Sequence, residues 1–166
     1  MRHAFLWALA LALVTASGNP ALAQAPASGS SIVGVWKLTS FVRKEVGSDK
    51  MTHSFGENPA GYRVHTPGGH AFYMFFDGNR KAPAGTLTDA DRSELFRTMT
   101  AAGGTYVVEG DKVLFRTEVS SAQATGRTLA YRYQITGKTL TMTTDPIKSA
   151  TGGGETYFVT TYERVE

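Results

Sequence analysis

Residues 53–76 read HSFGENPAGYRVHTPGGHAFYMFF, and this stretch decides the fold of the chain. Pro59 marks a loop before the first strand, because it keeps Asn58 extended and removes one backbone donor. Residues 61–66 and 70–76 then read as two strands joined by a tight Pro-Gly-Gly tip, which is the pattern of a β-hairpin. The stretch therefore predicts antiparallel β-structure.

Short strands bounded by turn signals continue along the chain on both sides of this hairpin. In residues 33–46, Trp36 and Leu38 alternate with Lys37 and Phe41, a period of two that suits a half-buried strand. The predicted strands are 33–46, 51–55, 61–66, 70–76, 105–109, 112–120, 127–136, 139–144 and 155–165. Their lengths and spacing predict an all-β fold, a closed antiparallel up-and-down barrel of about 8–10 strands without free sheet edges.

One short helix is predicted among the strands, at about residues 88–102. Thr88 is placed to cap it, acidic residues occupy its first turn, and Leu95 and Met99 stand four residues apart. The Gly-Gly pair at 103–104 predicts its end. A single amphipathic helix among strands is expected to plug or flank the sheet.

The amino terminus has the pattern of a secretory signal peptide. Arg2 and His3 form a basic start, residues 4–16 an apolar run, and residues 21–23 a small-residue site that predicts cleavage before Gln24. The run is shorter than the about 20 residues that cross a bilayer, so we expect export, to the periplasm or beyond the cell. The predicted divisions are a signal peptide at 1–23, a disordered leader at 24–31 and one barrel domain at 32–166.

Composition excludes several classes of function. The formal charge of +3 falls to +2 without Arg2, and the cations are scattered, so nucleic-acid binding is not expected. The chain has no cysteine, which excludes disulfides, a lipid-bearing cysteine and a cysteine nucleophile. No serine stands in a Gly-x-Ser-x-Gly elbow, and the glycines at 152–154 precede a strand rather than a helix, so neither a hydrolase nor a phosphate loop is indicated. We expect a monomer without a cofactor.

Alternation also sorts the strand residues into inward and outward faces. The inward residues predicted to line the lumen and bind a ligand are Tyr73, Phe75, Phe115, Tyr131, Tyr133 and Met142. On the opposite faces, Arg116, Glu118 and Arg132 are expected to form exposed ladder pairs. If the faces of strands 112–120 and 127–136 are inverted, these charges become anchors for a ligand carboxylate. The pattern leaves open whether the inward rings fill the barrel or surround a cavity.

The histidines and the glutamate of the hairpin region carry groups that can bind metals or transfer protons. His65 and His70 would lie opposite each other beside His53 or Glu57, but no metal-ligand spacing is present, so no metal site is expected. Glu57 is expected to accept backbone amide hydrogen bonds in its turn. The alternative hypothesis makes Glu57 or His70 a general acid or base at the barrel mouth, with Tyr73 orienting a substrate oxygen.

Several segments together carry a resemblance to a known family. They are GVWKLTSF at 34–41, FGENPAG at 55–61 with HTPGGH at 65–70, GTY at 104–106 and YERV at 162–165. With them, residues 32–165 resemble the bacterial lipocalin-like domain family. The sequence departs from the expected pattern at His65, where tyrosine is expected, and at Tyr162, where tryptophan is common.

The resemblance implies a calycin-type barrel that binds a small apolar molecule. Some similar barrels catalyse cyclisations, isomerisations or hydrations, and the resemblance assigns no catalytic residue to this chain. In lipocalins a first-strand tryptophan packs against an arginine of the last strand. For this chain, that implies a structural cation–π contact between Trp36 and Arg164.

Three hypotheses about function follow. The first is an exported lipocalin-like protein, not an enzyme, that binds a small hydrophobic or aromatic ligand in the lumen. The second is a cofactor-free isomerase, cyclase or hydratase acting there on a polyketide- or terpenoid-like substrate, and the third is a structural or partner-binding barrel with a filled core. A cavity on the order of several hundred cubic ångströms that holds a buried ionisable group would favour the enzyme. An all-apolar cavity would favour the carrier, and no cavity the filled barrel.

Overall fold

The computed structural model describes residues 31–81, 83–122, 124–148 and 154–166. The predicted signal peptide, 1–23, lies outside the described residues, as does all of the predicted leader except Ser31. No helix in the described part of the chain is long and apolar enough to span a membrane.

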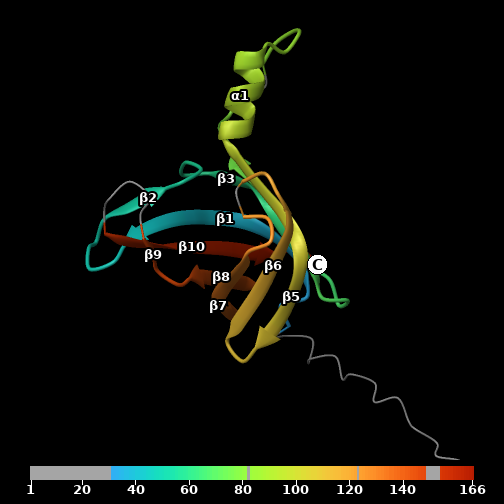
Figure 1. Cartoon of the computed structure of the whole chain (residues 1–166), viewed down its shortest axis with the longest axis vertical. Coiled ribbons are helices and arrows are strands. Elements are labelled where there is room, and N and C mark those ends of the chain that lie inside the picture. Colours follow the sequence, from blue (N-terminus) through green and yellow to red (C-terminus); the bar gives the residue numbers. More distant parts are fainter. Residues whose placement is uncertain (1–30, 82, 123, 149–153) are drawn as a thin grey trace, which may run out of the picture.

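The described residues form an antiparallel barrel with one helix (Figure 1). The elements are β1 (Gly34–Glu45), β2 (Met51–His53), β3 (Pro59–His65), β4 (His70–Asp77), α1 (Asp89–Arg97), β5 (Met99–Glu109), β6 (Lys112–Ser120), β7 (Thr128–Thr136), β8 (Thr139–Thr144), β9 (Ile147–Lys148) and β10 (Glu155–Arg164). Their order in the sheet is β2-β1-β3-β4-β5-β6-β7-β8-β10-β9, and β1 also pairs with β10. This last pairing closes eight strands into a barrel, which confirms the predicted fold. Short strand β2 pairs alongside the C-terminal part of β1, and β9 pairs alongside the N-terminal part of β10.

A bulge in β1 changes which side chains face the lumen. The register with β10 shifts between Leu38 and Ser40, and a bulge of this kind moves the alternation to the other face. Trp36 and Leu38 point inward as predicted and are buried. Beyond the bulge the prediction is wrong, because Phe41 enters the interior and packs edge-on against Phe75 at a centroid distance of 6.0 Å.

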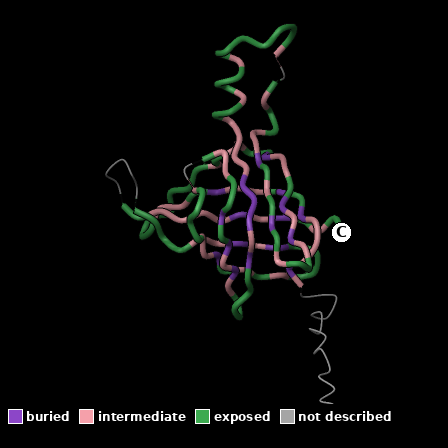
Figure 2. Tube along the Cα trace, turned by 45° about the vertical axis from the view of Figure 1, so that its right-hand side comes forward, coloured by how far each residue is buried: buried purple, intermediate pink, exposed green. Residues whose placement is uncertain are grey.

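The helix begins where predicted but ends early. Thr88 caps α1, accepting a hydrogen bond from the Asp91 backbone, and the Asp91 carboxylate accepts one from the Thr88 backbone in return. The predicted end at 102 is wrong, because residues from Met99 onward form β5 and pair with β4. None of the helical residues is buried, and α1 projects from the end of the barrel (Figure 2). It therefore does not plug the barrel.

The Gly-Gly pair at 103–104, predicted to end the helix, lies in β5 and allows that strand to approach β6 closely. A Cβ on Gly104 would lie 2.0 Å from the Arg116 carbonyl oxygen, so only glycine fits there. The register between β5 and β6 also shifts at this pair. Past this bulge the Val119 side chain is exposed on the outer surface, although strict alternation from Phe115 would place it inside.

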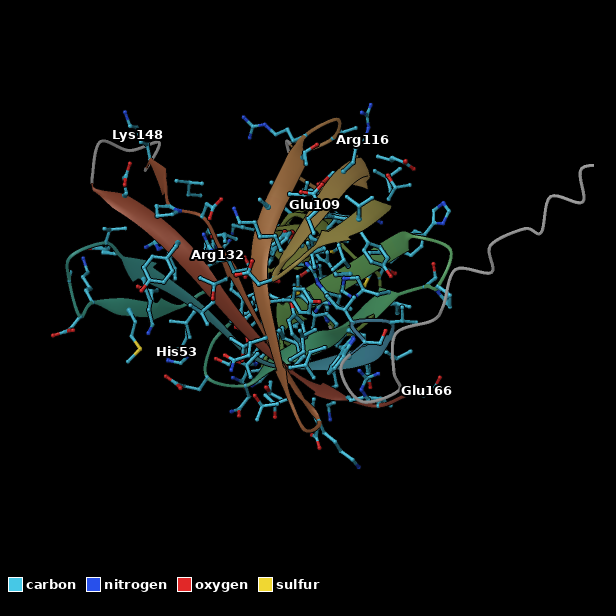
Figure 3. The ribbon with its side chains drawn as sticks, turned by 90° about the horizontal axis from the view of Figure 1, so that it is seen from below. His53, Glu109, Arg116, Arg132, Lys148 and Glu166 are labelled. Carbon is cyan, nitrogen blue, oxygen red and sulfur yellow. The ribbon has the colours of Figure 1, made fainter. Side chains whose placement is uncertain are left out.

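The remaining face assignments for β6 and β7 are confirmed. Phe115 and Tyr131 are buried inside, whereas Arg116, Glu118 and Arg132 are exposed. Figure 3 shows Arg116 pointing away from the barrel. The inverted arrangement, with these charges as lumen anchors, is therefore excluded. Arg132 pairs with Asp111, 3.1 Å away, rather than with a charge on β6.

The contact between Trp36 and Arg164 is present at one end of the barrel. The Arg164 Cζ atom lies 4.1 Å from the Trp36 ring centroid. Its Nη1 donates to the Val33 carbonyl at 2.9 Å, and its Nη2 donates to the Ser31 carbonyl. The Trp36 Nε1 donates to the Ile32 carbonyl at 2.8 Å. Arg164 thus joins the segment that enters the barrel to the last strand.

Replacing Arg164 with alanine tests this role. The change removes the ring contact and two charge-assisted hydrogen bonds, so the free energy of unfolding should fall by about 2–3 kcal/mol. Urea titration would measure it. The matched control is Arg43→Ala, which truncates an exposed arginine of β1 and should change stability by less than about 0.5 kcal/mol. Equal effects of the two substitutions would contradict the assigned role.

Candidate functional site

A cavity of about 440 Å³ occupies one end of the barrel. Its wall is mostly apolar and aromatic, and eight strands contribute to it. The lining residues are Phe41, Arg63, Tyr73, Phe75, Thr100, Thr128, Leu129, Ala130, Tyr131, Thr144, Asp145, Ile147, Phe158, Thr160 and Tyr162. Exposed residues such as Asp145 and Ile147 mark its mouth, whereas Arg63 and Tyr162 are buried.

The structure divides the predicted lumen residues into two groups. Tyr73, Phe75 and Tyr131 line the cavity. Phe115 and Met142 are fully buried in the packed core, and partly buried Tyr133 packs against that core without lining the cavity. Both of the arrangements left open by the sequence therefore occur, since one end of the barrel is filled and the other is hollow.

Several lining residues were not predicted, and the most informative is Arg63. Strand β3 is inverted relative to the usual pattern, because Tyr62 is about half exposed while Arg63 and His65 are buried. Alternation alone would place the apolar side chains inside. The sequence contained one indication of this inversion. Arg63 and His65 share one face of the strand, and its apolar residues occupy the other.

Arg63 is buried without an acidic partner. Its side chain is 3% exposed, and among the described residues no carboxylate lies within 4.0 Å of it. Within the described part of the chain, its Nε atom has no hydrogen-bond partner. The guanidinium remains charged at any ordinary pH, and a buried charge without a counterion is strongly unfavourable.

Three tyrosine rings surround this guanidinium. The Arg63 Cζ atom lies 4.8 Å from the ring centroid of Tyr73, 5.0 Å from that of Tyr131 and 5.9 Å from that of Tyr162. The rings offer the cation their negative faces, which offsets part of the desolvation cost. They carry no formal charge, so the positive charge is not neutralised.

The tyrosines of this cluster are neutral hydrogen-bonding groups. Burial raises the pKa of Tyr73 to about 12, and the neighbouring Arg63 charge only partly opposes this. Burial also raises the pKa of Tyr162, whose hydroxyl has no hydrogen-bond partner among the described residues. These phenols can donate hydrogen bonds to a bound oxygen, but they do not act as bases near neutral pH.

His65 lies inside the barrel and pairs with Ala71, so the prediction that it lies opposite His70 is wrong. It is 1% exposed, and its ring meets Tyr106 edge-on at 4.9 Å. Burial, assisted by the nearby Arg63 charge, lowers the pKa of His65 to about 2. Neither ring nitrogen has a hydrogen-bond partner among the residues that the structure describes. His70, by contrast, is exposed as expected.

The weak candidates for acid–base chemistry lie away from the cavity. Neither Glu57 nor His70 lines it, and the Glu57 side chain is 78% exposed. Its Oε1 lies 3.6 Å from the His53 Nε2, whereas the predicted bonds to backbone amides are not formed in the described part of the chain. No group of three or more possible metal ligands occurs among the described residues.

A closed antiparallel barrel with a packed end and a cavity at the other end is the architecture of small ligand-binding barrels. The family model described as a lipocalin-like domain matches residues 33–165. The chain belongs to this lipocalin-like domain family, as the resemblance indicated. No curated protein matches the chain.

The burial of neutral His65 predicts a pH dependence of stability. Unfolded histidine titrates near pH 6.5, so between about pH 6.5 and 2 the unfolded chain binds a proton that the folded chain does not. Above about pH 6.5 the histidine is neutral in both the folded and the unfolded chain, so the burial of His65 then carries no protonation cost. As the pH falls, stability should decrease by up to about 1.4 kcal/mol per pH unit.

His65→Phe should flatten this decline, measured as the free energy of unfolding in urea from about pH 7.5 to about pH 5. The control His70→Phe replaces an exposed histidine and should keep the original slope. An unchanged slope in the His65 variant would show that its ring is accessible to protons.

Replacing Arg63 with methionine should stabilise the ligand-free protein. The substitution keeps a similar side-chain volume and removes a buried, uncompensated charge, so the free energy of unfolding should rise by about 1–3 kcal/mol. Thermal or urea unfolding would measure the gain. Arg116→Met removes the same charge from the surface and should shift stability by less than about 0.5 kcal/mol. A loss of stability in the Arg63 variant would assign the guanidinium a structural role.

Proposed function

We propose that the protein is an exported binding protein that holds one small, largely apolar molecule in the barrel lumen. The observation that carries this proposal is the cavity of about 440 Å³. Its size and its mostly apolar wall match those of small-molecule sites, which enclose about 300–1,000 Å³. Family membership supports the same assignment. Export rests on the signal-peptide pattern of residues 1–23.

Aromatic residues give the cavity its preference for planar ligands. Phe41 packs edge-on with Phe158 at 5.5 Å, and Tyr73 stacks on Phe75 at 4.8 Å with an interplanar angle of 14°. Rings held at these angles present faces and edges between which another ring can stack. An aromatic or polycyclic body is therefore favoured over a flexible chain.

A second candidate function is a cofactor-free isomerase, cyclase or hydratase. The specific observation that favours it is Arg63, because a cavity that holds a buried ionisable group is expected of an enzyme on this barrel. Arg63 and the neutral hydroxyl of Tyr73 would stabilise negative charge developing on a substrate oxygen. A proton acceptor is harder to assign, because Asp145, the one carboxylate among the lining residues, is exposed at the mouth. No buried base is found among the described lining residues, so binding is the leading proposal.

The two candidates differ in the fate of the bound molecule. Native mass spectrometry of protein purified from its own host would identify a co-purifying ligand. A binding protein returns that molecule unchanged after incubation, whereas the enzyme converts it. The third hypothesis, a filled barrel, loses its basis because the cavity is present.

Binding can be tested with N-phenyl-1-naphthylamine, a neutral dye that fluoresces in apolar surroundings. We expect saturable binding, and Thr100→Trp should weaken it by about tenfold or more, because the new indole would occupy space in the cavity. Thr100 pairs with the inward Phe75 and lines the cavity.

The matched control makes the same substitution on the outer face of the same strand. Thr105 pairs with the exposed residues His70 and Arg116, so Thr105→Trp should leave the dye affinity unchanged. Dye binding that is absent in the original protein, or equal in the two variants, would contradict a ligand site in the lumen.

A further inference from the structure

We propose that the molecule held in the lumen carries a carboxylate, or an anionic group with the same paired oxygens, and that this group binds Arg63. The inference rests on the proposed binding function and adds the chemical class of the ligand. It describes an amphipathic molecule whose apolar rings fill the cavity and whose anionic end lies deep in the barrel beside the guanidinium.

Arg63 lacks a counterion among the described residues. Arg63 is 3% exposed, lines the cavity and has no carboxylate within 4.0 Å among the described residues. Buried charges in folded proteins are paired or hydrogen-bonded, because desolvation is otherwise too costly. The cavity is the place from which a partner can reach this guanidinium.

A second arginine of the same barrel, Arg164, is held differently from Arg63. Arg164 also has an aromatic ring against its guanidinium, but in addition it donates to two backbone carbonyls. Arg63 has the aromatic contacts, but the polar groups near its guanidinium are the neutral hydroxyls of Tyr131 and Tyr162 rather than carbonyls, and its Nε has no acceptor among the described residues. An arginine that serves only packing would be satisfied in the manner of Arg164. Arg63 instead keeps donors free beside an open space.

The free N–H donors of Arg63 suit an anionic group with two oxygens. A guanidinium presents N–H groups in a planar fork that matches the two oxygens of a carboxylate. The Tyr162 hydroxyl, also buried and without a hydrogen-bond partner in the described ranges, lies within the same cluster and supplies a further donor. A neutral ligand would leave the positive charge uncompensated, so the site favours an anion.

Charge along the cavity also favours one orientation of the ligand. Asp145, the acidic residue among the lining side chains, is exposed at the mouth. It repels an anion there, whereas Arg63 attracts one toward the buried end. The anionic group is therefore expected at the deep end and the apolar body nearer the opening, between Phe41 and Phe158.

The test uses two probes of similar shape that differ in charge, the anion 2-naphthoate and the neutral 2-naphthamide. Isothermal titration calorimetry near neutral pH would measure the affinity of each for the full mature protein. We expect 2-naphthoate to bind about tenfold or more tightly than 2-naphthamide, because it forms a charge-assisted pair in a desolvated site. In Arg63→Met this preference should disappear while 2-naphthamide still binds.

Arg116→Met is the control, because it removes the same charge from the outer surface of β6 and should retain the preference. Equal affinities of the two probes in the original protein, or a preference that survives Arg63→Met, would overturn the assignment of an anionic ligand and leave lumen binding intact. If neither probe nor the neutral dye binds, the proposed binding function fails, and this inference fails with it. If Arg63→Met does not fold, Arg63→Gln provides the same comparison with a neutral side chain.

Discussion

The pairing of the first strand with the last one is the constraint on which the rest of the structure depends. Strands β1 and β10 run antiparallel from Trp36 opposite Arg164 to Glu45 opposite Thr156, and this contact turns an open sheet into a barrel. Without it there would be two exposed edges and no enclosed volume. The same pairing brings Trp36 to Arg164 at the packed end and Phe41 opposite Thr160 beside the cavity. Closure therefore creates both the core and the site.

The interior changes in character along the barrel. Around Trp36, Val113 and Leu140, side chains fill the space completely, and each of these residues is 0% exposed. Toward the other end, large rings stand apart and leave a hollow with a charged group in its wall. The packed end supplies the apolar burial that keeps the fold stable. The hollow end can then contain an arginine that stability alone would not select.

The fold followed from local signals in the sequence, whereas the candidate site required information that local patterns do not contain. Turn residues and strand periodicity were sufficient for the barrel, and Tyr73, Phe75 and Tyr131 were assigned to the lumen from alternation. Phe41 was missed because a bulge two residues earlier reverses the alternation, and nothing local signals that bulge. Met99 was assigned to the helix because its spacing from Leu95 suits one, but pairing with β4 is a long-range contact that overrides such a preference. Arg63 was missed because a charged side chain in a strand is ordinarily outside.

The inverted pattern of β3 has a consequence for how the barrel folds. A slip of one residue would exchange the faces of this strand, placing Tyr62 and Val64 inside and Arg63 and His65 in water, an arrangement that hydrophobic burial alone would favour. Two features oppose it. The short tip between β3 and β4 fixes the register through paired hydrogen bonds of Thr66 with His70. Gly61 approaches the backbone of β4 so closely that a Cβ would lie 2.0 Å from the Met74 carbonyl oxygen. The hairpin thus carries local frustration: its register is determined by turn geometry against the preference of its side chains. Placing Arg63 in the cavity wall therefore requires that a competing register of β3, with its apolar side chains inside, be excluded while the chain folds.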